Sequence, residues 1–193
     1  MFIVQEKAIM LVWGLIAAVP LTGVLAAFVT PRVVEYVETI EIKGKARDIF
    51  DAIRFQARLM EWSAWPPETG SACAVEGPDG EMGARTVFMQ KNGARFGHQE
   101  IVTIQDGVSV GFVLKSKGPP HKPQLDFHVV PVDADTTRVV LHFHNDIMPP
   151  FNLIQRLAGM VRWTREMHRK DLDGLKRYIE RRENYLGEQP KAA

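Results

Sequence analysis

The sequence predicts an α+β domain in which a curved antiparallel sheet of about six or seven strands packs around one long C-terminal helix. Three observations predict this fold. Residues 149–183 carry an apolar residue about every 3.6 positions, which is typical of an amphipathic helix. Residues 72–146 contain only short β-type runs separated by turn signals. The helical patterns lie on either side of that region, so helices and strands are segregated along the chain.

The long helix is predicted to begin at Pro149 and Pro150, because proline is tolerated in a first helical turn. Its apolar stripe consists of Ile154, Leu157, Val161, Met167, Leu172, Leu175 and Ile179. A stripe on a helix of about nine turns needs a long apolar partner. Only the strands offer one. Gly174 interrupts a good helical sequence, which would be explained by a close approach of the sheet.

Residues 8–29 contain no Asp, Glu, Lys or Arg. A helix of this length spans about 33 Å, enough for a hydrocarbon core of about 30 Å. We therefore expect residues 1–32 to be an N-terminal transmembrane anchor. A cleaved signal peptide and a buried globular helix remain open alternatives. Lys7 precedes the span and Arg32 follows it, so the basic bias is nearly even; we expect a single-pass protein whose soluble domain is extracytoplasmic.

The folded part begins with an alternating strand over residues 33–42, in which Val34, Tyr36 and Glu38 share a face. Residues 45–61 predict two short helices, or one that breaks near Phe55, and Pro66 and Pro67 are expected to end helicity. The strands that follow are expected at residues 72–76, 82–91, 97–105, 108–115, 125–132 and 137–147. Residues 187–193 are expected to form a disordered tail.

Composition excludes some classes of function. Of 24 basic and 23 acidic residues, Lys7, Arg32 and Glu6 lie in the first 32, which leaves 22 of each sign in the domain. A nucleic-acid partner is therefore not expected, because such binders carry a basic excess. The single cysteine, Cys73, excludes an internal disulfide.

Four segments carry a resemblance to a known superfamily: KARDIFDAIRF after the first strand, EWSAWPP, GPDGEMGAR and LDGLKRYIE near the end of the last helix. In their order along the chain they resemble the START-like, or SRPBCC, helix-grip superfamily, and in particular its polyketide cyclase/dehydrase and lipid-transport group. The resemblance covers residues 33–183 and implies one helix-grip domain over residues 33–186. It also implies a cavity for a hydrophobic ligand between the sheet and the long helix.

Strand alternation predicts which side chains would face such a cavity. The expected ligand-binding residues are Trp62, Trp65, Val110, Phe112, Leu125, Phe127, Leu141, Phe143, Val161 and Leu172. A solid core without a pocket is the alternative, since packed interiors are the rule. Trp62 and Trp65 would then be lids on the core instead of the lining of an entrance.

No catalytic residue, metal site or cofactor is predicted. His128, His142 and His144 come together if the last two strands pair so that His128 opposes His142 and Asp126 opposes His144. That face lies outside the sheet, where histidines are seldom metal ligands. Cys73 has no histidine near it in sequence, and no hydrolase or nucleotide-binding motif occurs.

The basic residues of the last helix are expected to form a solvated face, with Glu166–Lys170 and Asp173–Arg177 pairs, although anionic lipid headgroups are an alternative partner. The function predicted from all these features is membrane-tethered binding, or transport, of a hydrophobic small molecule such as a lipid, quinone or polyketide-like compound, without catalysis. A polyketide cyclase or dehydratase using the same cavity is the first alternative, and an interaction module without a ligand is another. The sequence leaves the oligomeric state open.

Overall fold

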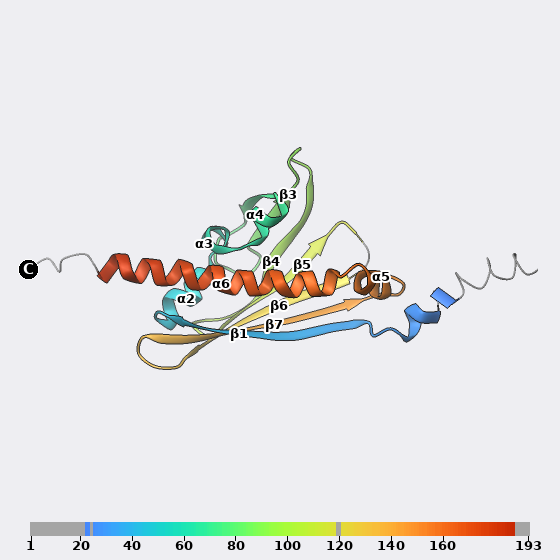
Figure 1. The fold of residues 1–193 in the computed structure, drawn as a ribbon. Helices are drawn as coiled ribbons and strands as arrows, with labels where there is room; N and C mark the ends of the chain where they lie inside the picture. Colours follow the sequence, from blue (N-terminus) through green and yellow to red (C-terminus); the bar gives the residue numbers. More distant parts are fainter. Residues whose placement is uncertain (1–21, 24, 119–120, 188–193) are drawn as a thin grey trace, which may run out of the picture.

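The computed structural model describes residues 22–23, 25–118 and 121–187. Within them, seven antiparallel strands form one curved sheet in the order β1-β7-β6-β5-β4-β3-β2 (Figure 1). The strands are β1 (Val33–Lys43), β2 (Ala72–Glu76), β3 (Arg85–Met89), β4 (Arg95–Gln105), β5 (Ser109–Ser116), β6 (His121–Pro131) and β7 (Thr136–Ile147). The predicted class and strand number are therefore confirmed. The sheet is a meander from β2 to β7, and β1 joins it beside β7.

Five helices flank the strands in the described part of the chain. They are α2 (Ala46–Arg54), α3 (Gln56–Trp62) and α4 (Trp65–Thr69) after β1, and α5 (Phe151–Leu157) and α6 (Met160–Gly187) after β7. Of these, α2, α3 and α6 contact the sheet. Figure 1 shows α6 running along the sheet. Its buried side chains, Leu172, Leu175 and Ile179, belong to the same core as Phe112 and Leu141 of the sheet. The predicted packing of the long helix on the apolar face is confirmed.

The single helix predicted over residues 149–183 is wrong in one respect: the structure has two helices. Gly159 lies between them with φ 71°, a left-handed conformation that glycine adopts without steric penalty and that ends a helix. The apolar stripe is buried only from Met167 onward. Ile154 and Leu157, which the pattern placed in the core, are 52% and 79% exposed.

The region after β1 also needs a correction. The break at Phe55 between α2 and α3 is confirmed, and the backbone N–H of Gln56 donates to the carboxylate of Asp79 at 2.6 Å, so a distant loop caps α3. The loop predicted around Pro66 and Pro67 is instead a third short helix, α4. Both prolines lie in its first turn, where their missing N–H groups have no helical partner to lose.

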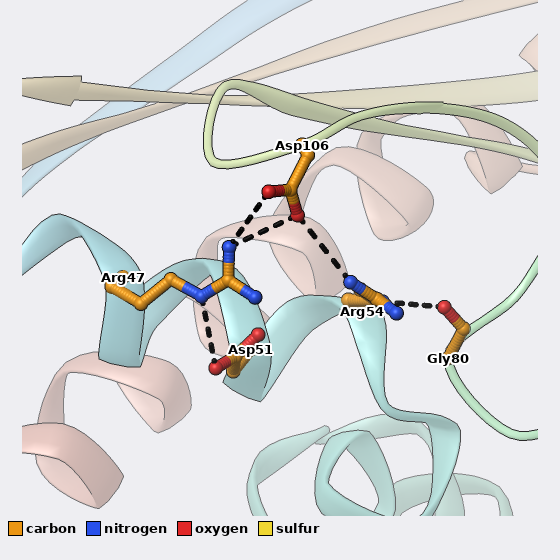
Figure 2. Close-up of polar contacts among 5 residues, drawn as sticks. All are labelled: Arg47, Asp51, Arg54, Gly80 and Asp106. Atoms are coloured by element: carbon orange, nitrogen blue, oxygen red, sulfur yellow. Dashed lines mark hydrogen bonds and ion pairs between the residues drawn. The ribbon is translucent and has the colours of Figure 1, made fainter.

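An ion-pair network fixes α2 against the loops at one end of the sheet (Figure 2). Arg47 Nη1 lies 3.0 Å from both carboxylate oxygens of Asp106, in the turn between β4 and β5. Arg54 contacts the same carboxylate at 3.4 Å and donates to the carbonyl of Gly80. Asp106 thereby holds both ends of α2, which keeps Ile49, Phe50 and Ile53 buried on the sheet.

Gly174 does lie at a close approach, as predicted, but its neighbour is α3 and not the sheet. A Cβ atom built there would lie 2.1 Å from the carbonyl oxygen of Trp62. The residue therefore allows α3 and α6 to pack with their backbones in contact.

The predicted anchor, residues 8–29, and most of the predicted tail, residues 187–193, lie largely outside the described residues. Residues 25–29 are helical and the helix ends at Thr30. Among the residues that the structure describes, no helix has both the length and the apolar character needed to cross a bilayer.

Candidate functional site

The concave face of the sheet brings together most of the predicted ligand-binding residues. Trp62, Val110, Phe112, Leu125, Phe127, Leu141, Phe143 and Leu172 are all buried in one core cluster, and Val161 packs against its margin. The ring of Phe127 makes edge contacts with Phe112 and Trp62, at centroid distances of 5.9 Å and 6.4 Å. These side chains share one interior, as alternation predicted. Their role in binding a ligand stays a prediction.

The two tryptophans predicted as a pair have different surroundings. Trp62 is buried, and its indole N–H donates to the carbonyl of Ala52 at 3.0 Å, so it closes the core beneath α2. Trp65 is half-buried at the start of α4 and contacts the rings of Trp163 and His168 at centroid distances of 5.2 Å and 5.8 Å. Only Trp65 lies where the interior meets solvent.

Trp65 belongs to a group of five rings that we call the aromatic cluster: Tyr36, Trp65, Phe143, Trp163 and His168. Tyr36 of β1 is paired with Phe143 of β7, and their rings stack at 4.9 Å. His168 of α6 lies 5.0 Å from Phe143 and 5.9 Å from Tyr36. The cluster leads from the core to Trp163, which is 39% exposed.

Two members of the aromatic cluster, Tyr36 and His168, are joined by a hydrogen bond. The Tyr36 hydroxyl and His168 Nδ1 lie 2.9 Å apart, and the tautomer of the histidine decides which atom donates. Burial lowers the pKa of His168 to about 4, against the opposing effect of Glu38. Burial likewise raises the pKa of Tyr36, although Arg165 opposes it. Both groups are therefore neutral at pH 7.

Asp171 lies one turn after His168 on the same buried face of α6. Its carboxylate accepts hydrogen bonds from the Ser63 hydroxyl at 3.0 Å and from the Ala64 N–H at 2.7 Å. Burial raises its pKa to about 7, even though these bonds favour the ionised form. Asp171 holds the segment before α4 on α6 and so sets the position of Trp65.

Glu38 lies two residues after Tyr36 on the same face of β1, and its side chain is 13% exposed. It forms ion pairs with Arg165 and with Arg169, the second at 3.0 Å. Burial alone would raise the pKa of Glu38, but the hydrogen bonds from Arg169 and Arg165 lower it. The Arg165 guanidinium also lies 5.2 Å from the centre of the Tyr36 ring. These ion pairs fix α6 on β1 beside the aromatic cluster.

This arrangement can bind an apolar or aromatic molecule and can move a proton. Aromatic side chains supply broad flat contacts, and Tyr36 and His168 supply a hydrogen-bond donor and an acceptor among these rings, beside the ion pairs of Glu38. A phenol that is hydrogen-bonded to a neutral imidazole can act as an acid–base pair.

A separate surface groove of about 470 Å³ lies between α6 and the segment from α3 to α4. Of the predicted site residues it contains only Trp62, and it is mainly polar and charged, with Glu61, Ser63, Ala64, Pro67, Glu68, Lys170, Asp173 and Arg177 completing its lining. Lys170 pairs across it with Glu68 at 2.6 Å, not with Glu166 as predicted. This lining does not suit a hydrophobic molecule.

Sequence reasoning missed His168 and Asp171 and gave Tyr36 no role beyond its strand. The signal that could have found the first two is their position: both lie on the apolar stripe of α6, among Met167 and Leu172, where a charged or titratable residue is unusual. Tyr36 carries no comparable signal, because an aromatic residue on the inner face of a strand is ordinary.

The histidines on the outer face do not take the predicted register. His128 opposes Val140, while Asp126 opposes His142 and Gln124 opposes His144. The rings of His128 and His142 still make a diagonal contact at 5.3 Å. Over the described part of the chain, no group of three His, Cys, Asp or Glu side chains could hold a metal ion. Cys73 is half-buried, and burial raises the pKa of its thiol.

Comparison with known proteins gives the family. The profile described as "Polyketide cyclase / dehydrase and lipid transport" matches residues 33–180, most of the chain. The chain belongs to this family. Among curated proteins, none matches it in sequence.

Several solved structures have the same fold as this chain. Norcoclaurine synthase from Thalictrum flavum, solved as a point mutant with a transition-state analogue, superposes with a TM-score of 0.59 at 13% identity, over 78% of this chain and 96% of that one. The protein XoxI from Bacillus cereus gives 0.56 at 11% identity, over 75% and 94%. The di-domain ARO/CYC StfQ from the steffimycin biosynthetic pathway gives 0.58 at 14% identity, over 79% and 52%. At these identities the likeness shows the SRPBCC fold alone.

Proposed function

We propose that this protein binds a hydrophobic small molecule, such as a lipid, a quinone or a polyketide-like compound, on the concave face between the sheet and α6. The observation that carries the proposal is the aromatic cluster, which extends from the buried Phe143 to the exposed Trp163. The family of the chain supports the same class of ligand. Burial of apolar ligand area at about 25 cal/mol per Å² would supply most of the affinity.

The rim of the concave face is where such a ligand enters. The core residues pack against one another, whereas Tyr36, Trp65 and Val161 are half-buried and Trp163 is exposed. A ligand gains contact area there by displacing the indole of Trp163 from Trp65, which requires only a side-chain movement.

The direct test is native mass spectrometry and organic extraction of the full chain, purified in detergent from its own host. A reproducible bound lipid, quinone or polyketide-like compound is the expected result. Trp163→Ala should weaken binding about tenfold, since the displaced indole would otherwise cover the ligand with a broad flat contact at the rim. Val130→Ala, on the exposed outer face of β6, is the matched control and should change nothing. Ligand-free protein, with no thermal shift from a panel of these compounds, would refute the proposal.

A second candidate function is a cyclase or dehydratase acting on a polyketide-like substrate, and a specific observation favours it. Tyr36 and His168 converge among the rings of the aromatic cluster, where a proton can be taken from a carbon beside a carbonyl and delivered to a departing hydroxyl, which leaves as water. Tyr36→Phe should then abolish the loss of water measured by mass spectrometry, while binding of the same compound persists. Unchanged turnover in this variant would exclude the role of Tyr36.

We also propose that residues 8–29 tether the domain to a bilayer, as a single-pass protein with its domain on the extracytoplasmic side. The absence of charged residues in this stretch supports the tether, and Lys7 before it supports the orientation. The full chain should float with vesicles in a density gradient and resist extraction by carbonate. Protease added to spheroplasts should digest the domain; full protection would reverse the orientation.

A further inference from the structure

Exposed apolar side chains gather where β7 leads into α5 and α6. Ile154 and Leu157 of α5 are 52% and 79% exposed, and Met148 and Met160 on either side of α5 are also exposed. Such a concentration within thirteen residues of chain is unusual for a surface that faces only water.

The helical residues 25–29 are fastened to this same region. Asn152 of α5 is fully buried, and its amide donates to the carbonyls of Ala27 and Thr30, each at 2.8 Å. Arg156 of α5 donates to the carbonyls of Pro31 and Val33 at 3.3 Å and 3.2 Å. Ala27 is buried, whereas Phe28 and Val29 are 71% and 83% exposed. Residues 25–29 are therefore held against α5 by hydrogen bonds, and both segments expose apolar side chains.

We propose that Phe28, Val29, Ile154, Leu157 and Met160 form a face that sits in the surface of the lipid bilayer. This inference rests on the proposed tether: residues 8–29 carry no charge, and residues 25–29 are the end of that stretch nearest the domain. When the stretch enters a bilayer, its end lies at the headgroup level. Four hydrogen bonds join α5 to the chain between Ala27 and Val33: one is accepted by Ala27 within that end, and three by the residues that follow it. Apolar side chains of α5 at this depth bury their area among the lipid chains.

The charges around this face fit the same partner. Arg162 is exposed on α6 next to the segments that carry it, where it can contact anionic headgroups. Arg32 and Arg156 are exposed as well, but Arg32 is paired with Asp146 at 3.2 Å and Arg156 donates to the carbonyls of Pro31 and Val33. Trp163 follows Met160 by three residues, and tryptophan is favoured at the membrane interface. A bilayer at this face would place the exposed ring of the aromatic cluster beside the lipid, so that a hydrophobic ligand reaches the concave side without crossing water.

The test uses the full chain in nanodiscs of phosphatidylcholine and phosphatidylglycerol. In a Cys73→Ala background, an environment-sensitive fluorophore is attached at Leu157→Cys or, as control, at Asp135→Cys in the exposed turn between β6 and β7. Figure 1 shows that this turn and α5 lie at opposite ends of the sheet. Nitroxide-labelled lipids should quench the fluorophore at position 157 strongly and the one at position 135 hardly at all. Ile154→Glu should reduce quenching at 157. Val130→Glu, which changes an exposed valine on the outer face of β6 (45% exposed, against 52% for Ile154), should leave it unchanged.

Each other outcome overturns the proposal in a distinguishable way. Equal, weak quenching at both positions, in chains that remain in the nanodiscs, would be consistent with the tether but would refute the proposal that this face sits in the bilayer. Failure of the chain to enter nanodiscs would refute the tether as well, yet it would leave ligand binding untouched. A blue-shifted fluorophore at position 157 without lipid, in a chain that is dimeric by native mass spectrometry, would assign the face to a second copy.

Discussion

At the scale of single residues, two buried titratable groups have opposite effects on the pH dependence of stability. The pKa of His168 is lowered from its ordinary value of 6.5 to about 4, so the folded protein resists a proton that the unfolded chain accepts. The pKa of Asp171 is raised from 3.8 to about 7, so the folded protein retains a proton that the unfolded chain releases. Between about pH 4 and 6.5, acidification destabilises the fold through His168 and stabilises it through Asp171.

Removing either group should therefore reveal how the other makes the free energy of unfolding depend on pH. In Asp171→Asn, His168 remains, and the free energy of unfolding should fall as the pH drops from 7 to 5. In His168→Gln, Asp171 remains, and the free energy of unfolding should rise over the same interval. Each slope is at most about 1.4 kcal/mol per pH unit. Urea unfolding at several pH values measures both.

The unaltered protein is the control for this pair of variants, because its two slopes oppose each other and should nearly cancel. Tyr36 contacts His168, Glu38 acts on the pKa of His168, and Arg165 and Arg169 are paired with Glu38; all four residues are the same in the three proteins. If the free energy of unfolding changed with pH in the same direction in both variants, the pKa shift assigned to at least one of the two buried groups would be wrong.

These residues also mark the limit of sequence analysis at this scale. Alternation correctly put Phe127, Leu141 and Phe143 on one inner face, because a strand's period of two leaves little choice. The contact of Tyr36 with His168 joins residues 132 positions apart and has no local pattern. It depends on how α6 is rotated and shifted along β1, which is set by packing.

At the scale of elements, the ion pairs from Glu38 fix α6 on β1. We expect Glu38→Gln to destabilise the fold by about 2 kcal/mol, because two guanidinium groups lose a largely buried carboxylate. Glu41→Gln is the matched control three residues along: its pair with Arg138 is exposed on both sides and should contribute less than about 1 kcal/mol. Equal losses in the two variants, measured by urea unfolding, would show that Glu38 does not hold the helix.

The contact between α3 and α6 makes a second prediction. Alanine is the better helix former by about 1 kcal/mol, yet Gly174→Ala should destabilise the protein by about 3 kcal/mol or more. A methyl group 2.1 Å from the Trp62 carbonyl forces the two helices apart. Thermal unfolding and the fluorescence of Trp62 should both report the separation.

Gly159→Ala is the comparison, since nothing lies within 4 Å of a Cβ atom there. Its penalty comes only from the left-handed φ of 71° and should be about 1–2 kcal/mol. A Gly174→Ala protein as stable as the parent would mean that the helices are not packed backbone to backbone.

Element boundaries followed from sequence where a local signal decides them. The break at Phe55 was predicted for this reason. Two errors have a common origin, because a proline can begin a helix as well as end one, and a glycine can lie inside a helix or end it. Pro66 and Pro67 begin α4 although they were expected to end helicity, and Gly159 ends α5 inside a stripe that otherwise continues with helical period.

At the scale of the whole molecule, the domain and the N-terminal stretch should be separable. A chain shortened to residues 30–193 loses the hydrogen bond from Asn152 to Ala27 but keeps all seven strands and the core. We expect the same circular dichroism spectrum and nearly the same urea midpoint, together with loss of flotation on vesicles. A shortened chain that unfolds would show that residues 22–29 are part of the domain.

The sheet order has a consequence for synthesis of the chain on the ribosome. Of the strands that the structure describes, β1 is made first, yet the strand it pairs with is β7, whose residue Asp146 lies opposite Val33 across 113 positions. This strand must therefore wait, with one inner and one outer row of side chains uncovered, until the residues of β7 (Thr136–Ile147) have been made. Nascent chains halted before β7 should be protease-sensitive and bound by chaperones, and the closing of the sheet is a late, cooperative event.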